Sequence, residues 1–245
     1  MKHDRIAKLL LILATIACIF CVWQAQSPLA KELAEAYLGS CNTMDAVFDL
    51  ENAVLLPADE WIAQAQKLDL QIDQYFLTEG YLNDFAKESL RNAPQPSEGK
   101  LEYTVDDDMP YFHINYVEMD PSGERAILHY SKLTYSRRIT EHDDGTYRLF
   151  DTGGAATTAA ELVKQDGQWK VAQYMGDDVH WASDSLYVRT MLLNYDPAPG
   201  KSFASLGEAL AYAESDPVSM IPEPLFFLSS GIVKLLTYFT GGMGY

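Results

Sequence analysis

The sequence predicts an α+β fold, with N-terminal helices packed on one face of an antiparallel sheet. Apolar residues recur every three or four positions between residues 29 and 91, which is typical of amphipathic helices. Alternating residues and turn sequences follow between residues 101 and 181, which favours strands. Helices followed by strands indicate a two-layer α+β domain. The sequence thus divides into a membrane or signal segment (1–28), the α+β domain (29–181) and a C-terminal extension (182–245).

The first 28 residues have the pattern of an export leader. No charged residue occurs from Leu9 to Ala30, and three basic residues precede that run: Lys2, Arg5 and Lys8. The basic end is expected on the cytoplasmic side and the rest of the chain on the far side of the membrane. Three fates stay open: an uncleaved helix over Ile6 to Ala25, cleavage after Ala25, or lipidation of Cys18. The expected location is the cell membrane with the body outside it, or secretion if the leader is cleaved.

Charge and cysteine content exclude several kinds of function. The net charge is −17, and the leader holds three basic residues but only one acidic residue, so the remainder is more acidic still. Nucleic acid and anionic lipid would be repelled by such a surface. Cys41 is the only cysteine outside the leader, so the body has no intramolecular disulfide and no thiolate metal cluster. We expect Cys41 to pack as a small apolar residue.

The helical region is expected to contain two helices. An apolar stripe over residues 33–37 begins the first helix, which is expected to end at Gly39. Asp59 is the expected N-cap of the second helix, and Gly80 is expected to bend or split it. The apolar face of the second helix consists of Trp61, Ala65, Leu68, Ile72, Tyr75, Phe76, Leu82, Phe85 and Leu90. A Pro- and Gly-containing linker follows over residues 92–100.

Four strands are predicted after the linker, in the order of a meander. The predicted strands are Tyr111–Met119, Arg125–Glu141, Thr146–Val163 and Gln168–Met175. The turns between them are Asp120-Pro-Ser-Gly123, His142-Asp-Asp-Gly145 and Asp166-Gly167. Gly153-Gly154 is the expected site of a β-bulge in the third strand.

The last predicted hairpin carries a family resemblance. Its sequence, Glu161-Leu-Val-Lys-Gln-Asp-Gly-Gln-Trp-Lys-Val171, resembles the final hairpin of nuclear-transport-factor-2-like (NTF2-like) domains. The resemblance implies a cone of N-terminal helices wrapped by a curved sheet from about Ala30 to Asp178, closed in part by Trp169. Extracytoplasmic bacterial copies of this fold are often accessory or ligand-binding modules. The fold alone assigns no chemistry, because it hosts enzymes, transport factors and scaffolds.

The C-terminal extension is predicted to hold two helices. A break at residues 196–200 precedes a short helix from Ser205 to Glu214, which Asp216-Pro217 ends. Leu225 to Thr240 has one charged residue and is too short to span a bilayer comfortably. Either this second helix packs across the domain, where it would plug the pocket of the cone, or it lies in the membrane interface.

Candidate site residues are those that a cone would gather in its interior. His113 and Asp151 are the candidate acid–base pair, because such catalysis needs a histidine and a carboxylate to converge. The candidate pocket residues are Tyr116, Tyr130, Tyr135, Trp169 and Tyr174. No cofactor and no metal site is predicted. The acidic clusters 106–108 and 142–144 lack the spacing of a calcium loop. The densest set of potential ligands, which is expected to form a solvated turn in preference to a cation site, consists of Asp177, Asp178, His180 and Asp184.

Two functions are compatible with these observations. The preferred hypothesis is a non-catalytic, membrane-anchored extracytoplasmic module that binds a protein or peptide partner. The alternative is a cone pocket for a small apolar ligand, with or without acid–base enzyme activity. Neither hypothesis includes nucleic acid as a partner.

Overall fold

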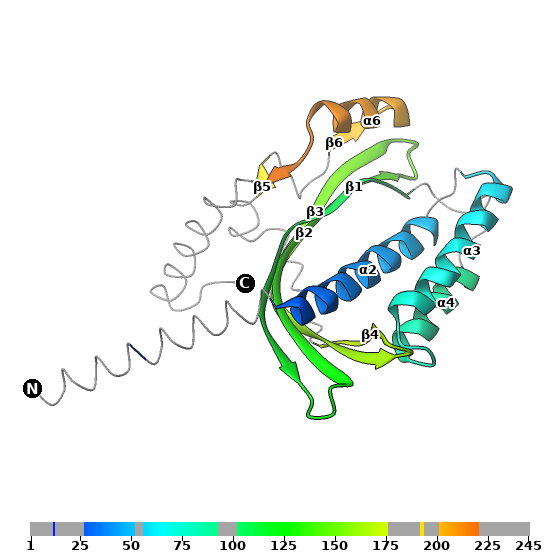
Figure 1. The fold of residues 1–245 in the computed structure, drawn as a ribbon. Helices are drawn as coiled ribbons and strands as arrows, with labels where there is room; N and C mark the ends of the chain where they lie inside the picture. The colour runs from blue at the N-terminus through cyan, green and yellow to red at the C-terminus, as the bar shows by residue number, and fades with distance from the viewer. Residues whose placement is uncertain are drawn as a thin grey trace, which may run out of the picture.

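The computed structural model describes residues 12, 27–51, 56–92, 102–175, 192–193 and 201–220. Helices come first and pack on a curled antiparallel sheet, a half-barrel, so the α+β prediction is confirmed (Figure 1). Among the helices in these ranges, none is both long and apolar enough to cross a bilayer. The predicted anchor over Ile6–Ala25, apart from Ile12, and the predicted helix 225–240 lie outside the described residues.

Where the structure describes residues 27–92, they form three helices: α2 (Pro28–Glu51), α3 (Ala58–Tyr75) and α4 (Tyr81–Asn92). The predicted end at Gly39 is wrong, because α2 continues through it. A Cβ at Gly39 would lie 2.5 Å from Cζ of Tyr75 on α3, so this glycine permits close helix packing and does not end the helix. The predicted split at Gly80 is confirmed, since α3 ends before it and α4 begins after it.

Pro57, and not Asp59, is the N-cap of α3, and no side chain provides a capping hydrogen bond there. Asp59 lies instead in the first turn. An aspartate is favoured both at the N-cap and in the first turn, where the helix dipole stabilises its negative charge, so the sequence alone does not separate the two positions.

The sheet is the predicted meander of β1 (Glu102–Met119), β2 (Arg125–Glu141), β3 (Tyr147–Gln165) and β4 (Gln168–Met175), in that order. Glycines with positive φ lie in all three connecting turns: Gly123, Gly145 and Gly167. The predicted bulge at Gly153-Gly154 is wrong, because β2 and β3 pair there without a shift of register. The register shifts of the β1–β2 pair, by contrast, include one between Ile114 and Tyr116.

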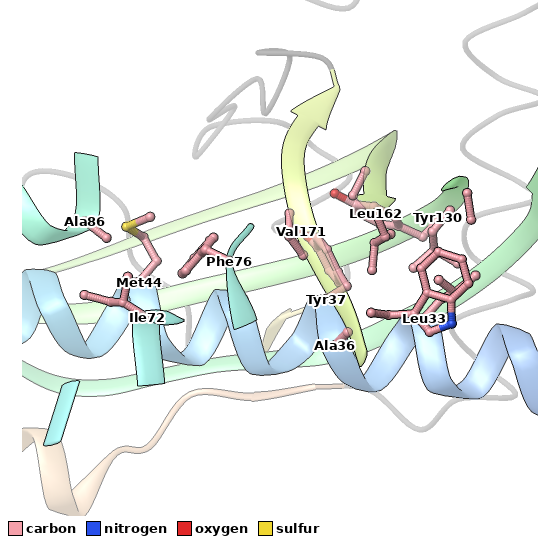
Figure 2. Close-up of a cluster of buried hydrophobic side chains, with 14 of the residues drawn as sticks. Leu33, Ala36, Tyr37, Met44, Ile72, Phe76, Ala86, Tyr130, Leu162 and Val171 are labelled. Carbon is pink, nitrogen blue, oxygen red and sulfur yellow. The ribbon is translucent and has the colours of Figure 1, made fainter. Parts of the chain in front are cut away.

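One face of the sheet, here called the inner face, packs against the helices. Its central side chains are Leu128 and Tyr130 of β2, Leu162 of β3 and Val171 of β4. Figure 2 shows Leu33 and Tyr37 of α2 next to Tyr130 and Leu162. Burying a large apolar side chain is worth about 1.5–3 kcal/mol, so this cluster provides much of the stability of the domain.

The opposite face of the sheet, here called the outer face, is also partly covered. Leu133 and Tyr135 of β2 pack with Leu192 of β5 (Leu192–Leu193) and with Val218. Ile139 of β2 packs with α6 (Leu206–Ser215), which lies on the opposite side of the sheet from α2 (Figure 1). The remaining short strands are β6 (Lys201–Phe203), paired with β3, and β7 (Ser219–Met220), paired with β5.

The start of α6 confirms the predicted short helix. The Ser205 hydroxyl accepts a hydrogen bond from the Glu208 backbone N–H, as an N-cap does, and Asp216 is the C-cap. The extension therefore begins to cover the outer face through a helix that its own sequence specifies.

Candidate functional site

The predicted site residues divide between the two faces of the sheet. Tyr130, Trp169 and Tyr174 belong to the core cluster of the inner face or pack against it. Tyr135 lies on the outer face, because it is an odd number of residues from Tyr130 on the same strand. Three further candidates pair with β2 residues of the outer face: His113, Tyr116 and Asp151.

Asp151 forms a buried ion pair with Arg137. The distances are 2.7 Å from Nε to Oδ1 and 2.9 Å from Nη2 to Oδ2, and the two side chains are only 2% and 3% exposed, respectively. Arg137 Nη1 also donates to the backbone carbonyl of Asp216, the C-cap of α6. The hydrogen bond to Asp151 raises the pKa of Arg137. The Asp151 carboxylate thus holds Arg137, and Arg137 in turn contacts the end of α6 on the outer face.

Tyr135 contributes a second polar contact on the outer face. Its hydroxyl donates to Asp106 Oδ2 over 2.8 Å, and burial raises its pKa. Neither contact brings a histidine next to a carboxylate in the way that acid–base catalysis needs.

His113 is exposed and stands apart from Asp151. It pairs across from Ser131, whereas Asp151 pairs across from Arg137, six residues farther along β2. Its ring stacks on Tyr111, with a centroid distance of 6.4 Å. The structure therefore does not bring the candidate acid–base pair together.

Tyr116 and His129 form another ring pair on the outer face, with centroids 4.0 Å apart. The His129 Nε2 atom lies 3.1 Å from Glu118 Oε1, within ion-pair distance but without hydrogen-bond geometry. In the parts of the chain that the structure describes, no group of three or more His, Cys, Asp or Glu side chains is placed to hold a metal ion.

Tyr37 of α2 is the centre of the aromatic cluster on the inner face. Its ring centroid lies 4.4 Å from that of Tyr130, 5.4 Å from that of Phe112 and 6.0 Å from that of Tyr174. Lys132 Nζ donates to the Tyr37 hydroxyl over 3.1 Å. The interior of the half-barrel at this point is occupied by side chains of the protein itself.

The phenols and the thiol in the aromatic cluster around Tyr37 have raised pKa values, which favours their neutral forms. Burial is the first cause that raises the pKa of each of these three phenols: Tyr37, Tyr130 and Tyr174. Burial also raises the pKa of the Cys41 thiol, although Lys132 opposes that shift. Cys41 is partly buried and packs against the core cluster, as the sequence predicts for a small apolar residue.

Asp45 is the acidic group of this region. Its side chain reaches solvent, yet neighbouring protein atoms remove enough hydration to raise its pKa, while Lys132 and Arg138 oppose the shift. Lys132 and Arg138 thus place positive charge near the Asp45 carboxyl at the edge of the aromatic cluster. Lys132 is not among the predicted site residues, although it shares its parity along β2 with Leu128 and Tyr130, which was the available signal.

Comparison with known proteins adds little to this geometry. No protein-family model and no curated protein matches the sequence. Among solved structures, the intermembrane space region of the chloroplast protein ARC6 shows 11% sequence identity and a TM-score of 0.34. The match covers 56% of this chain and 93% of that chain.

Proposed function

We propose that this protein is a non-catalytic, extracytoplasmic module that is held at the membrane by its N-terminal segment and binds a protein or peptide partner. We further propose that its curled sheet and helices form an NTF2-like cone. The charge-free segment that follows the basic N-terminus supports the location. The arrangement of helices on one face of a curled meander sheet supports the fold proposal.

The proposal of a binding function rests mainly on the filled inner face of the sheet. Tyr37 packs against Tyr130 and Tyr174 on the inner face of the half-barrel, and all three belong to the core or contact it. The candidate base Asp151 is engaged by Arg137 on the other face. Binding through an external surface therefore fits the geometry better than turnover of a ligand inside the cone.

Crosslinking in intact cells tests this proposal. The full chain, with a C-terminal tag, would be treated with a membrane-impermeant crosslinker and purified for mass spectrometry. We expect one enriched neighbour, together with protease sensitivity of the body from outside the membrane. A body protected in the cytosol, or a chain that yields no neighbour, would contradict the proposal.

A variant at the inner face separates this proposal from the small-molecule alternative. Lys132→Met removes the charged group beside Tyr37 and Asp45. If the function is external binding, the neighbour found with the wild type should be recovered unchanged. Loss of that neighbour in Lys132→Met would contradict external binding and would favour the alternative of a small-molecule site at the inner face.

A further inference from the structure

The outward face of α4 carries a strip in which aromatic and acidic residues alternate. The strip consists of Tyr81, Asp84, Phe85 and Glu88, which are spaced i, i+3, i+4 and i+7 and are all exposed. Residues with this spacing lie on one side of a helix. The other side of α4 packs on the core through Ala86 and Leu90, so the strip faces away from the core.

The aromatic side chains of the strip are arranged as a continuous row. Tyr81 is 77% exposed and Phe85 is 39% exposed, and their rings stack with centroids 6.2 Å apart. Phe85 also meets Phe48 of α2 edge to face, with centroids 6.3 Å apart. Rings that pack against one another in solvent form a rigid apolar surface, and ordering such a surface costs little entropy when a partner binds.

We propose that the strip binds a basic amphipathic helix of another protein. This inference rests on the proposed binding function and identifies the surface and the chemical class of the partner. The rings would receive apolar side chains spaced i and i+4, while Asp84 and Glu88 would face Lys or Arg side chains beside them. Lys87, the basic residue between Tyr81 and Glu88, is turned toward α3, where it pairs with Asp73 over 2.6 Å.

Charge distinguishes this occupant from the other candidates. A second copy of this chain would place the same two carboxylates against themselves, and its net charge of −17 opposes association. An anionic lipid surface would be repelled for the same reason. A basic helix is attracted by the chain as a whole and by the residues that flank the rings.

Peptide binding to the full chain in nanodiscs of zwitterionic lipid tests the inference. The probe is a fluorescent amphipathic helical peptide with Leu at i and i+4 and Lys elsewhere on the same face. A matched peptide with Glu in place of Lys, and empty nanodiscs, are the controls. We expect binding of the basic peptide only, weakening as salt is added. The inference would be overturned if both peptides bound equally well, or if empty nanodiscs bound the basic peptide as well as nanodiscs that hold the protein.

Variants locate the contact on the strip. Tyr81→Ala with Phe85→Ala should weaken peptide binding by about tenfold or more, as loss of an aromatic anchor does at interfaces. Leu70→Ala is the control, because it removes a side chain that is 73% exposed on α3. Asp84→Asn with Glu88→Gln should reduce the salt dependence, whereas the same charge change at Glu32 and Glu35 of α2 should not. Equal effects of the strip and control variants would reject the strip.

The crosslinking experiment in cells separates this inference from the proposed function. With Tyr81→Ala and Phe85→Ala together, the wild-type neighbour should be lost. Retention of that neighbour would overturn the strip as the binding surface while leaving the binding function intact. Absence of any neighbour in the wild type would overturn both.

Discussion

Replacement of Gly39 by alanine tests the packing between α2 and α3. Alanine normally stabilises the interior of a helix by up to about 1 kcal/mol relative to glycine. At Gly39, however, the added Cβ would meet Cζ of Tyr75 at 2.5 Å and Cδ1 at 2.6 Å, far inside van der Waals contact. Three atoms of the Tyr75 ring meet the added Cβ, so the ring as a whole would have to turn away from its partly buried place against the core cluster.

The sign of the effect follows from comparing two magnitudes. Overpacking a filled interior costs about 1–3 kcal/mol, which exceeds the gain in helix propensity. We therefore expect Gly39→Ala to lower the free energy of unfolding by up to about 2 kcal/mol. For a chain of this size, each 1 kcal/mol corresponds to a fall in Tm of roughly 2–4 °C.

Thermal unfolding of the full chain in a non-ionic detergent, followed by near-UV circular dichroism, measures this change. Gly207→Ala in α6 is the matched control, since its Cβ would meet nothing within 4 Å and its Tm should stay equal or rise. In a Tyr75→Ala background the Gly39→Ala substitution should cease to destabilise, because the clash is gone. If Gly39→Ala raised Tm as Gly207→Ala does, or lowered it equally without the Tyr75 ring, the reasoning would be refuted.

Three further predictions concern charge and ionisation. Asp151→Ala removes the carboxylate that pairs with the buried Arg137 and should lower the free energy of unfolding in urea by about 3–5 kcal/mol, whereas Asp151→Asn should lower it less; a loss below about 1 kcal/mol would contradict the buried pair. The buried phenols of Tyr37, Tyr130 and Tyr174 have raised pKa values, so absorbance titration should show them neutral well above pH 10 until the protein unfolds. The free energy of unfolding should fall as pH rises past about 10, the ordinary phenol pKa. The hydrogen bond from Lys87 lowers the pKa of Asp73, so this pair stabilises the fold above the ordinary aspartate pKa of about 4, and that stability is lost as pH falls through the lowered value. Because the Asp73 side chain is 44% exposed, the pair should contribute less than about 1 kcal/mol to the free energy of unfolding. Asp73→Asn should reduce the loss of stability on acidification by no more than this amount. An unchanged dependence of stability on acidic pH would rule out the contribution.

The fold was largely predictable because its connections are specified locally. Asp166-Gly167 and the two other turns fix the hairpins through residues that tolerate positive φ, so strand order followed from the sequence. Ser205 likewise marked the start of α6. Gly39 was misinterpreted because its role depends on Tyr75, which lies 36 residues away in the chain and on another helix.

Assignment of residues to faces of the sheet was less successful, because burial on both faces removes the usual alternation. Tyr130 packs inward against α2, while Tyr135 packs outward against the C-terminal extension. A strand that is apolar on both sides gives no polar face to mark the solvent side. The partner layer on the outer face comes from residues 192–193 and 201–220, so no local pattern around β2 announces it.

The irregularity in β1 explains the placement of Tyr116. Strict alternation from Phe112 and Ile114 predicts that Tyr116 also faces inward, with its hydroxyl available in the cone. The register shift between Ile114 and Tyr116 places the intervening Asn115 out of step, and its side chain donates instead to the Ser131 hydroxyl over 3.1 Å. Tyr116 is thereby moved to the outer face opposite His129, while Val117 takes the inner position opposite Leu128. One extra residue thus reverses the parity of the strand, and it removes a polar ring from the interior that α2 already fills.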